Sequence, residues 1–161
     1  MDMRKAVICV ALFLLMQITI SFAVAGNTRN VLYYPGDYEG NTLVFEKAKI
    51  GGAIMKNSHT GFYCLCVEID GEFTPGILYK SQLNFVVASP ELADKLATQL
   101  SQNSKYHKAT HEINLMNHLN RGGACPVRLT AKIQKLFGYW IAVVSKIEFY
   151  GNESTIINTV N

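Results

Sequence analysis

The sequence has little charge, little proline and few cysteines for its length. Of its 161 residues, 17% are charged, four are proline and four are cysteine, and the formal net charge is only +3. So small a net charge does not provide the dense lysine and arginine surface that gives dedicated nucleic-acid binders most of their affinity. The hydrophobic fraction of 49% is too high for a disordered chain, and the length is too short for an enzyme with a separate cofactor domain. The composition therefore predicts one globular domain.

The sequence also lacks a catalytic signature. Its acidic residues are scattered, without a pair whose separation the sequence fixes, so nothing supports a glycosidase. His107 and His111 would share a helix face as a metal pair does, with His118 nearby, but no His-Glu-x-x-His motif follows from them. We therefore expect a protein that is not an enzyme and holds no metal or cofactor. A small secreted metal-binding or enzymatic factor, built on these histidines or on the cysteines, is an alternative.

The first 25 residues have the order of a secretory signal. Two basic residues, Arg4 and Lys5, precede an apolar run that ends in Ala-Val-Ala at Ala25. The run is about long enough to span a bilayer, so a retained membrane helix is the alternative. The small-residue ending and the polar residues inside the run favour cleavage after Ala25. We expect an exported protein, periplasmic or secreted, with no stable membrane anchor after cleavage.

Cleavage would leave three cysteines, Cys64, Cys66 and Cys125, in an oxidising compartment. One disulfide between Cys125 and either Cys64 or Cys66 is the first interpretation, with one thiol left over. Cys64 and Cys66 would share a strand face, and they would not bond each other without distortion. Buried free thiols are the second interpretation. A metal site is the third, although a Cys-x-Cys pair with one distant cysteine is a weak match to metal-ligand spacing.

Alternating apolar and polar residues predict a mainly β domain. The paired glycines Gly51-Gly52 predict a bend or bulge where a long first strand turns across a barrel. The expected strands cover residues 43–52, 62–69, 83–87, 127–134 and 139–150, with a short irregular strand over 73–78.

The last expected strand is apolar on both faces where it begins. The N-terminal lead-in or a partner molecule should therefore cover its second face. Simple alternation places Ile141, Val143, Ile147 and Phe149 on one side of this strand, and Trp140, Ala142 and Val144 on the other.

The remaining segments are expected to be a lead-in, one helix, an insertion and a tail. Residues 26–40 are rich in Asn, Pro and Gly and predict an irregular lead-in. Ser89-Pro90-Glu91 is a good helix start, and the leucine spacing behind it predicts a helix over 90–100. The insertion 101–123 is expected to contain a second helical stretch, and 151–161 a short polar tail with a formal glycosylation sequon at Asn152.

The order of three strands, a helix and two strands resembles the oligonucleotide/oligosaccharide-binding (OB) fold. That fold is a five-stranded Greek-key barrel whose helix lies between the third and fourth strands. The resemblance covers residues 41–150, with 101–123 as a partly helical insertion before the fourth strand. It rests on the element order, the glycine break and the two closing strands. The nearest similar groups are small exported bacterial OB proteins and domains of the tRNA-anticodon-binding type.

The resemblance implies that ligands lie across the second and third strands and the adjoining loops. The matching outward positions are Phe62 and Asn84, with Lys56, His59 and Lys80 in nearby loops. We expect an exported, non-enzymatic binding module for a protein, a peptide or an envelope glycan outside the cytoplasm. A nucleic-acid-binding OB domain is the alternative, against which export argues.

Aromatic residues outside the strands have two interpretations. Tyr33, Tyr34 and Tyr38 of the lead-in and Trp140 of the last strand could contact a ligand. The favoured interpretation is that the tyrosines pack over the apolar start of the last strand.

Overall fold

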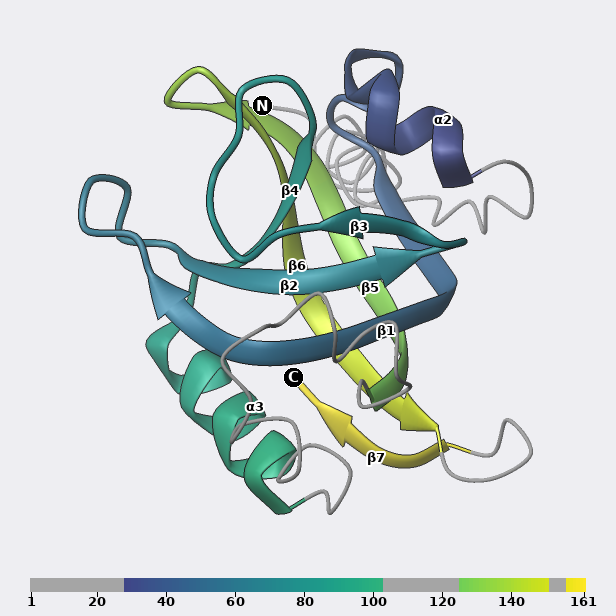
Figure 1. Cartoon of the computed structure of the whole chain (residues 1–161), viewed down its shortest axis with the longest axis vertical. Helices are drawn as coiled ribbons and strands as arrows, with labels where there is room; N and C mark the ends of the chain where they lie inside the picture. The colour runs from purple at the N-terminus through teal and green to yellow at the C-terminus, as the bar shows by residue number, and fades with distance from the viewer. Residues whose placement is uncertain (1–27, 103–124, 151–155) are drawn as a thin grey trace, which may run out of the picture.

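The computed structural model describes residues 28–102, 125–150 and 156–161 (Figure 1). The expected signal segment 1–25, the three histidines of the insertion and the sequon at Asn152 lie outside these ranges. Within them, no helix has the length and the apolar character needed to cross a membrane.

Five strands close into a mixed β-barrel, which confirms the predicted fold class. Around the barrel each strand pairs with the next in the order β1-β2-β4-β6-β5-β1, and every pair is antiparallel except β4 with β6. The helix α3 follows the third barrel strand, as expected. This arrangement is compatible with an OB-like fold. The barrel strands are β1 (Thr42–Lys56), β2 (Tyr63–Ile69), β4 (Leu83–Val87), β5 (Cys125–Leu136) and β6 (Tyr139–Tyr150).

The long strand β1 closes the barrel because it pairs with two strands in turn. Its first part, from Thr42 to Ile50, pairs with β5, and its last part, from Ala48 to Lys56, pairs with β2. The register with β2 shifts between Gly51 and Met55. The predicted glycine bend is therefore confirmed, and it lies where β1 leaves one partner strand for the other.

Strand β6 contains a bulge at Ser145, and the expected division of its side chains was wrong. Ala131 pairs with Val144 and Thr130 with Lys146, so Ser145 has no opposite residue in β5. A single inserted residue reverses which later side chains face inward. The inner side of β6 consequently carries Ala142, Val144, Ile147 and Phe149, all of them buried in the main core.

Two segments are more ordered than the sequence indicated. The lead-in is not irregular, because it forms the helix α2 (Thr28–Tyr33) and the 3-10 helix η1 (Pro35–Tyr38). Part of the expected tail forms the strand β7 (Ile156–Val160). Strand β7 pairs with β6 over Ile147–Tyr150, a part of β6 that β4 does not reach. A further short strand, β3 (Glu72–Thr74), pairs with β2.

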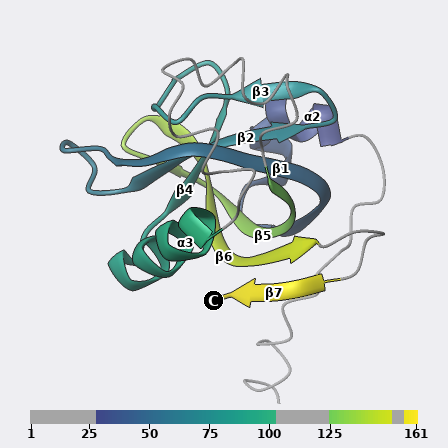
Figure 2. The ribbon, with the colours of Figure 1, turned by 60° about the horizontal axis from the view of Figure 1, so that its bottom comes forward.

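The helices α2 and α3 (Pro90–Gln102) lie on opposite sides of the barrel (Figures 1 and 2). At the start of α3 the backbone N–H of Leu92 donates to Ser89 Oγ at 3.2 Å, and Ser89 Oγ donates to Glu91 at 2.6 Å. This confirms the predicted cap. Hydrogen bonding from Ser89 also holds the pKa of the Glu91 carboxyl below its usual value. The residues that α2 and α3 bury in the core are Val31, Leu32, Leu92, Ala93, Leu96 and Leu100.

Candidate functional site

The outer face of β2 and β4, where OB barrels bind their ligands, is covered in this protein. Cys64, Val86 and Ile141 alternate with residues of the main core, so their side chains point out of the barrel. They are nevertheless buried, because Leu78 from the loop between β3 and β4 packs against them. This loop, residues 75–82, lies beside the first half of β6 (Figure 1). We call it the cover loop.

Asn84 fastens the cover loop and is not an outward ligand-binding residue, which corrects its predicted role. Its side chain is only 1% exposed. The backbone N–H of Tyr79 donates to Asn84 Oδ1 at 2.7 Å. Asn84 Nδ2 lies 2.7 Å from the carbonyl oxygen of Tyr79 and 2.9 Å from those of Gln82 and Trp140. The amide is therefore saturated by backbone groups and has no capacity for a ligand.

The three described cysteines are buried and none of them is bonded to another, so the expected disulfide is not formed. Cys64 points outward beneath the cover loop, whereas Cys125 lies on the inner side of β5, within the main core. The wall of the barrel therefore separates the predicted partners. Cys66 is also buried, and its thiol is hydrogen-bonded to the backbone of Gly76 in the cover loop.

Burial gives the Cys66 thiol an unusual pKa, which predicts a pH-dependent stability. Desolvation raises this pKa from 9.0 to about 12, against an opposing effect of the Gly76 hydrogen bond. The unfolded thiol ionises near pH 9, while the folded thiol stays neutral. The contribution to stability is therefore complete below pH 9 and is lost as the pH rises toward 12. Relative to pH 7.5, we expect Cys66 ionisation to cost about 1 kcal/mol of unfolding free energy at pH 10.

Urea unfolding of the wild type and of Cys66→Ala at both pH values measures this contribution. We expect the unfolding free energy to decrease less between pH 7.5 and pH 10 in Cys66→Ala than in the wild type. Equal decreases in the two proteins would show that Cys66 ionisation does not contribute.

Two aromatic rings meet beside the cover loop, one from each of two hairpins. Phe62, which directly precedes β2, and Phe137, in the turn between β5 and β6, have ring centroids 6.1 Å apart at an interplanar angle of 62°. Phe62 packs against the buried cluster of Cys64, Val86 and Ile141, whereas Phe137 is 63% exposed. Both hairpins lie on the same side of the molecule in the two views (Figures 1 and 2).

The predicted basic residues lie in the loops near these rings. Lys56 is exposed at the end of β1, and its Nζ lies 5.6 Å from the centroid of the Tyr63 ring. His59 is exposed in the loop between β1 and β2, where its backbone N–H donates to Asn57 Oδ1 at 3.1 Å. Lys80 is exposed in the cover loop. We use the name loop rim for Phe62, Phe137, Lys56, His59 and Lys80.

Phe137 was absent from the predicted site, although the sequence contained a weak indication of it. The pair Phe137-Gly138 connects two long expected strands, so a bulky aromatic residue stands in a hairpin turn. The structure gives Phe137 a φ of 53°, which is unfavourable for a residue with a side chain. An exposed ring at a strained turn position contributes little to folding, which is typical of a residue retained for contact.

Of the three lead-in tyrosines, only Tyr38 packs against the barrel core. Tyr38 and Trp140 are partly buried against the main core, and Gly36 approaches the Trp140 ring so closely that an added Cβ would lie 3.4 Å from it. The lead-in thus covers the Trp140 ring of the last strand through Gly36. Tyr33 and Tyr34 are exposed, and the Tyr33 hydroxyl donates to Glu72 at 2.8 Å.

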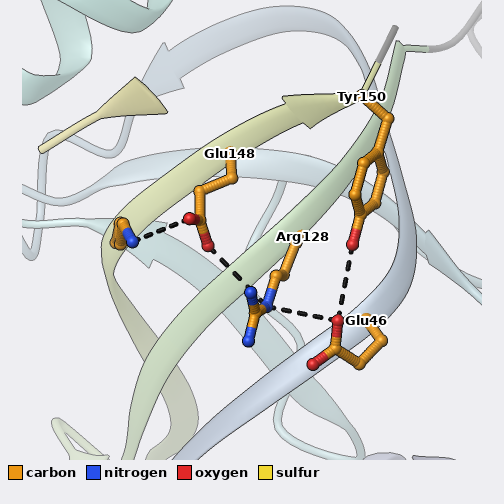
Figure 3. Close-up of polar contacts among 5 residues, drawn as sticks. Glu46, Arg128, Glu148 and Tyr150 are labelled. Carbon is orange, nitrogen blue, oxygen red and sulfur yellow. Dashed lines mark hydrogen bonds and ion pairs between the residues drawn. The ribbon is translucent and has the colours of Figure 1, made fainter. Parts of the chain in front are cut away.

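A cluster of charges on the outer side of β1, β5 and β6 was not predicted (Figure 3). Arg128 Nε lies 3.2 Å from Glu46 and 3.7 Å from Glu148, and Lys146 Nζ donates to Glu148 at 2.7 Å. Tyr150 donates to Glu46 at 3.4 Å. The register shift of β1 between Phe45 and Ala48 brings Glu46 opposite Arg128. The cluster links three strands and presents no free acid–base pair for catalysis.

We expect this cluster to contribute to stability mainly through Glu148. The Glu148 side chain is almost fully buried between two cations, so Glu148→Ala leaves Arg128 and Lys146 facing each other and should cost about 1–3 kcal/mol. Glu46→Ala is the matched control. Because Glu46 is half-exposed, the loss of its ion pair with Arg128 should cost only about 0–1 kcal/mol. Denaturant unfolding measures both values. Equal costs would contradict the central position of Glu148.

A hollow of about 540 Å³ lies between α3 and β7. At its edge, Lys95 Nζ donates to the carbonyl oxygen of Asn161 at 2.9 Å. Its lining consists of Asp94, Lys95, Thr98, Gln99, Thr159, Val160 and Asn161.

The described parts of the chain contain no group of three or more His, Cys, Asp or Glu residues that could hold a metal ion. The chain matches no protein-family model, and no curated protein or solved structure is significantly similar to it. The geometry of the barrel and of the loop rim is therefore the basis for a functional assignment.

Proposed function

We propose that this protein is an exported, non-enzymatic binding module of the OB type, which binds a protein, peptide or glycan ligand through the loop rim. The observation that carries the proposal is the exposed Phe137 ring packed on Phe62. Exposed aromatic rings with a firm apolar base are typical of binding hot spots. The loop rim binds its ligand through non-covalent contacts.

The position of the rim in the barrel supports the OB assignment. In OB folds the loops between strands 1 and 2 and between strands 4 and 5 hold the ligand. With the five barrel strands counted along the chain, these are the loop after β1 and the turn between β5 and β6, from which Phe62 and Phe137 come. The cover loop closes the face between them, so a ligand would bind at the rim and not across β2 and β4.

Single-stranded nucleic acid is the second candidate ligand, because aromatic rings beside lysines also suit stacked bases and phosphates. The expected secretory signal and the low net charge disfavour it. Binding that falls steeply with added salt, with a slope set by the number of phosphate contacts, would identify this class.

The export part of the proposal is tested by the intact mass of the protein recovered from each cell fraction and from the medium. A chain that begins at Gly26 outside the cytoplasm is the expected result. A full-length chain in the cytoplasm would overturn export and would make nucleic acid the leading ligand.

The binding part of the proposal predicts that Phe137→Ser separates binding from folding. Because Phe137 is largely exposed, its loss should change the unfolding free energy by no more than about 0.5 kcal/mol. Binding of a rim ligand should weaken about 10-fold to 30-fold, as for a hot-spot aromatic. Tyr34→Ser is the matched control, since Tyr34 is 66% exposed on the α2 side.

Calorimetric titration of peptide, glycan and oligonucleotide pools against the wild type and both variants provides the measurement. Ligands that bind Phe137→Ser and the wild type equally would contradict the loop rim as the site.

A further inference from the structure

The loop rim has an unbalanced charge. The segments that build it and its surroundings, residues 51–67, 73–90 and 129–147, contain no Asp or Glu. The same segments contain five lysines, of which Lys56 and Lys80 belong to the rim. Any partner of the rim therefore meets positive charge without a compensating carboxylate.

The acidic side chains nearest in the strands are already engaged elsewhere. Glu68 pairs with Lys49 at 2.8 Å, and Glu72 pairs with Arg29 at 3.4 Å on the α2 side of the molecule. Glu46 and Glu148 belong to the charge cluster around Arg128. Glu91, at the start of α3, accepts a hydrogen bond from Ser89 Oγ. The loop rim itself carries Lys56 and Lys80 and no carboxylate, so its own charge is positive.

The arrangement of the two aromatic rings favours contact with an apolar side chain over stacking of successive bases. Phe62 and Phe137 meet nearly edge to face, so they do not form the parallel platform on which successive bases stack. Beneath them lies an apolar base to which Leu78 and Tyr139 also contribute. An exposed ring on an apolar base suits contact with an aliphatic or aromatic anchor that is desolvated on binding.

We infer that the partner of the loop rim is an acidic peptide segment, in which an apolar side chain is flanked by Asp or Glu. The apolar side chain packs against the exposed Phe137 ring and its neighbour Phe62, and the flanking carboxylates lie near Lys56 and Lys80. This inference rests on the proposed function and narrows its ligand to one class. Charge complementarity, together with an exposed ring that forms no parallel stacking platform, favours peptide over glycan and nucleic acid.

The test is a selection of random peptides displayed on phage against the purified protein, followed by binding measurements with a synthetic copy of the enriched peptide. We expect enriched sequences with Asp or Glu on both sides of an apolar residue. Lys56→Glu and Lys80→Glu should each weaken binding of that peptide by about fivefold or more, and Phe137→Ser by at least about tenfold. Lys47→Glu is the matched control, because Lys47 is exposed on β1 beside the Arg128 cluster.

Polygalacturonate and oligothymidylate are measured in parallel as an acidic glycan and a single-stranded nucleic acid. Enriched peptides that are neutral or basic, or that bind Lys56→Glu and Lys80→Glu as well as the wild type, would overturn the acidic partner and leave the proposed function intact. Phe137-dependent binding of polygalacturonate without peptide enrichment would overturn the peptide class alone, whereas such binding of oligothymidylate would also replace the proposed function by its nucleic-acid alternative. Absence of Phe137-dependent binding in all three classes would overturn both the inference and the proposed function.

Discussion

Phe85→Ala is expected to lower the unfolding free energy by about 3–5 kcal/mol, the largest effect that we predict for a single substitution. Phe85 is 1% exposed on the inner side of β4, and its ring lies 5.1 Å from that of Phe45 at an interplanar angle of 76°. Strands β4 and β1 do not pair with each other, because β2 lies between them in the barrel. The two rings therefore meet across the interior, and removing one leaves a cavity that the closed barrel cannot collapse to fill.

Urea unfolding followed by Trp140 fluorescence measures this loss. Phe85→Leu keeps most of the volume and should cost clearly less, which keeps the prediction testable if the alanine variant does not fold. A double-mutant cycle with Phe45→Ala should show a coupling of about 0.5–1.5 kcal/mol beyond simple addition. A cost for Phe85→Ala close to that of the exposed Phe137→Ser would mean that the barrel interior is not packed as described.

The barrel itself could be predicted from the sequence, because its signals are local and repeated. In β5, buried residues from Val127 to Ile133 alternate with polar ones, and this alternation is visible without the structure. The break at Gly51-Gly52 was informative for a different reason: a paired glycine inside an otherwise β-rich run has few uses except a bend. The Ser89 cap and the leucine stripe similarly defined α3.

The features that were missed depend on contacts between distant segments. The bulge at Ser145 adds one ordinary residue to β6, and no composition rule marks it, so the inner and outer sets after it were exchanged. The helix α2 has six residues, too few to be stable alone, and it forms because Val31 and Leu32 enter the core. Strand β7 exists because β6 extends beyond the end of β4.

The candidate site was predicted in part, and the error at Asn84 is instructive. The position of Asn84 on the outer side of β4 was inferred correctly from alternation, but outward was taken to mean exposed. The cover loop, which directly precedes β4, folds back over that face. Conversely, Phe137 lies in a turn, where patterns of alternation carry no information, and only the structure shows that its ring reaches Phe62.

Asn84→Ala is expected to cost about 2–4 kcal/mol and to release the cover loop. The substitution removes the acceptor for the Tyr79 N–H and the donors for the carbonyl oxygens of Gln82 and Trp140. Each buried backbone group that loses its partner costs about 1–3 kcal/mol. At the exposed margin of the loop, water can form some of the lost hydrogen bonds and so reduce this cost. Asn41→Ala is the matched control, because Asn41 is exposed and its loss should cost about 0.5 kcal/mol or less.

Thiol alkylation followed by mass spectrometry reports the loop directly, since Cys66 is hydrogen-bonded to Gly76 beneath it. We expect Cys64 and Cys66 to react faster in Asn84→Ala than in the wild type or in Asn41→Ala, while Cys125, inside the barrel, stays protected. Asn84→Asp keeps the acceptor for Tyr79 but loses the donors, so it should also loosen the loop. Unchanged thiol protection together with an unfolding free energy within about 0.5 kcal/mol of the wild type would show that other contacts hold the loop.

The release of the cover loop also has a consequence for binding. Leu78 of this loop packs against the same buried cluster of Cys64, Val86 and Ile141 that supports Phe62. If that support is what keeps the Phe62 ring in place against Phe137, Asn84→Ala should weaken rim binding although it changes no residue of the loop rim. Unaltered affinity in a variant whose thiols have become reactive would show that the rim is held by its own two hairpins. In that case the cover loop would serve only to close the outer face of β2 and β4.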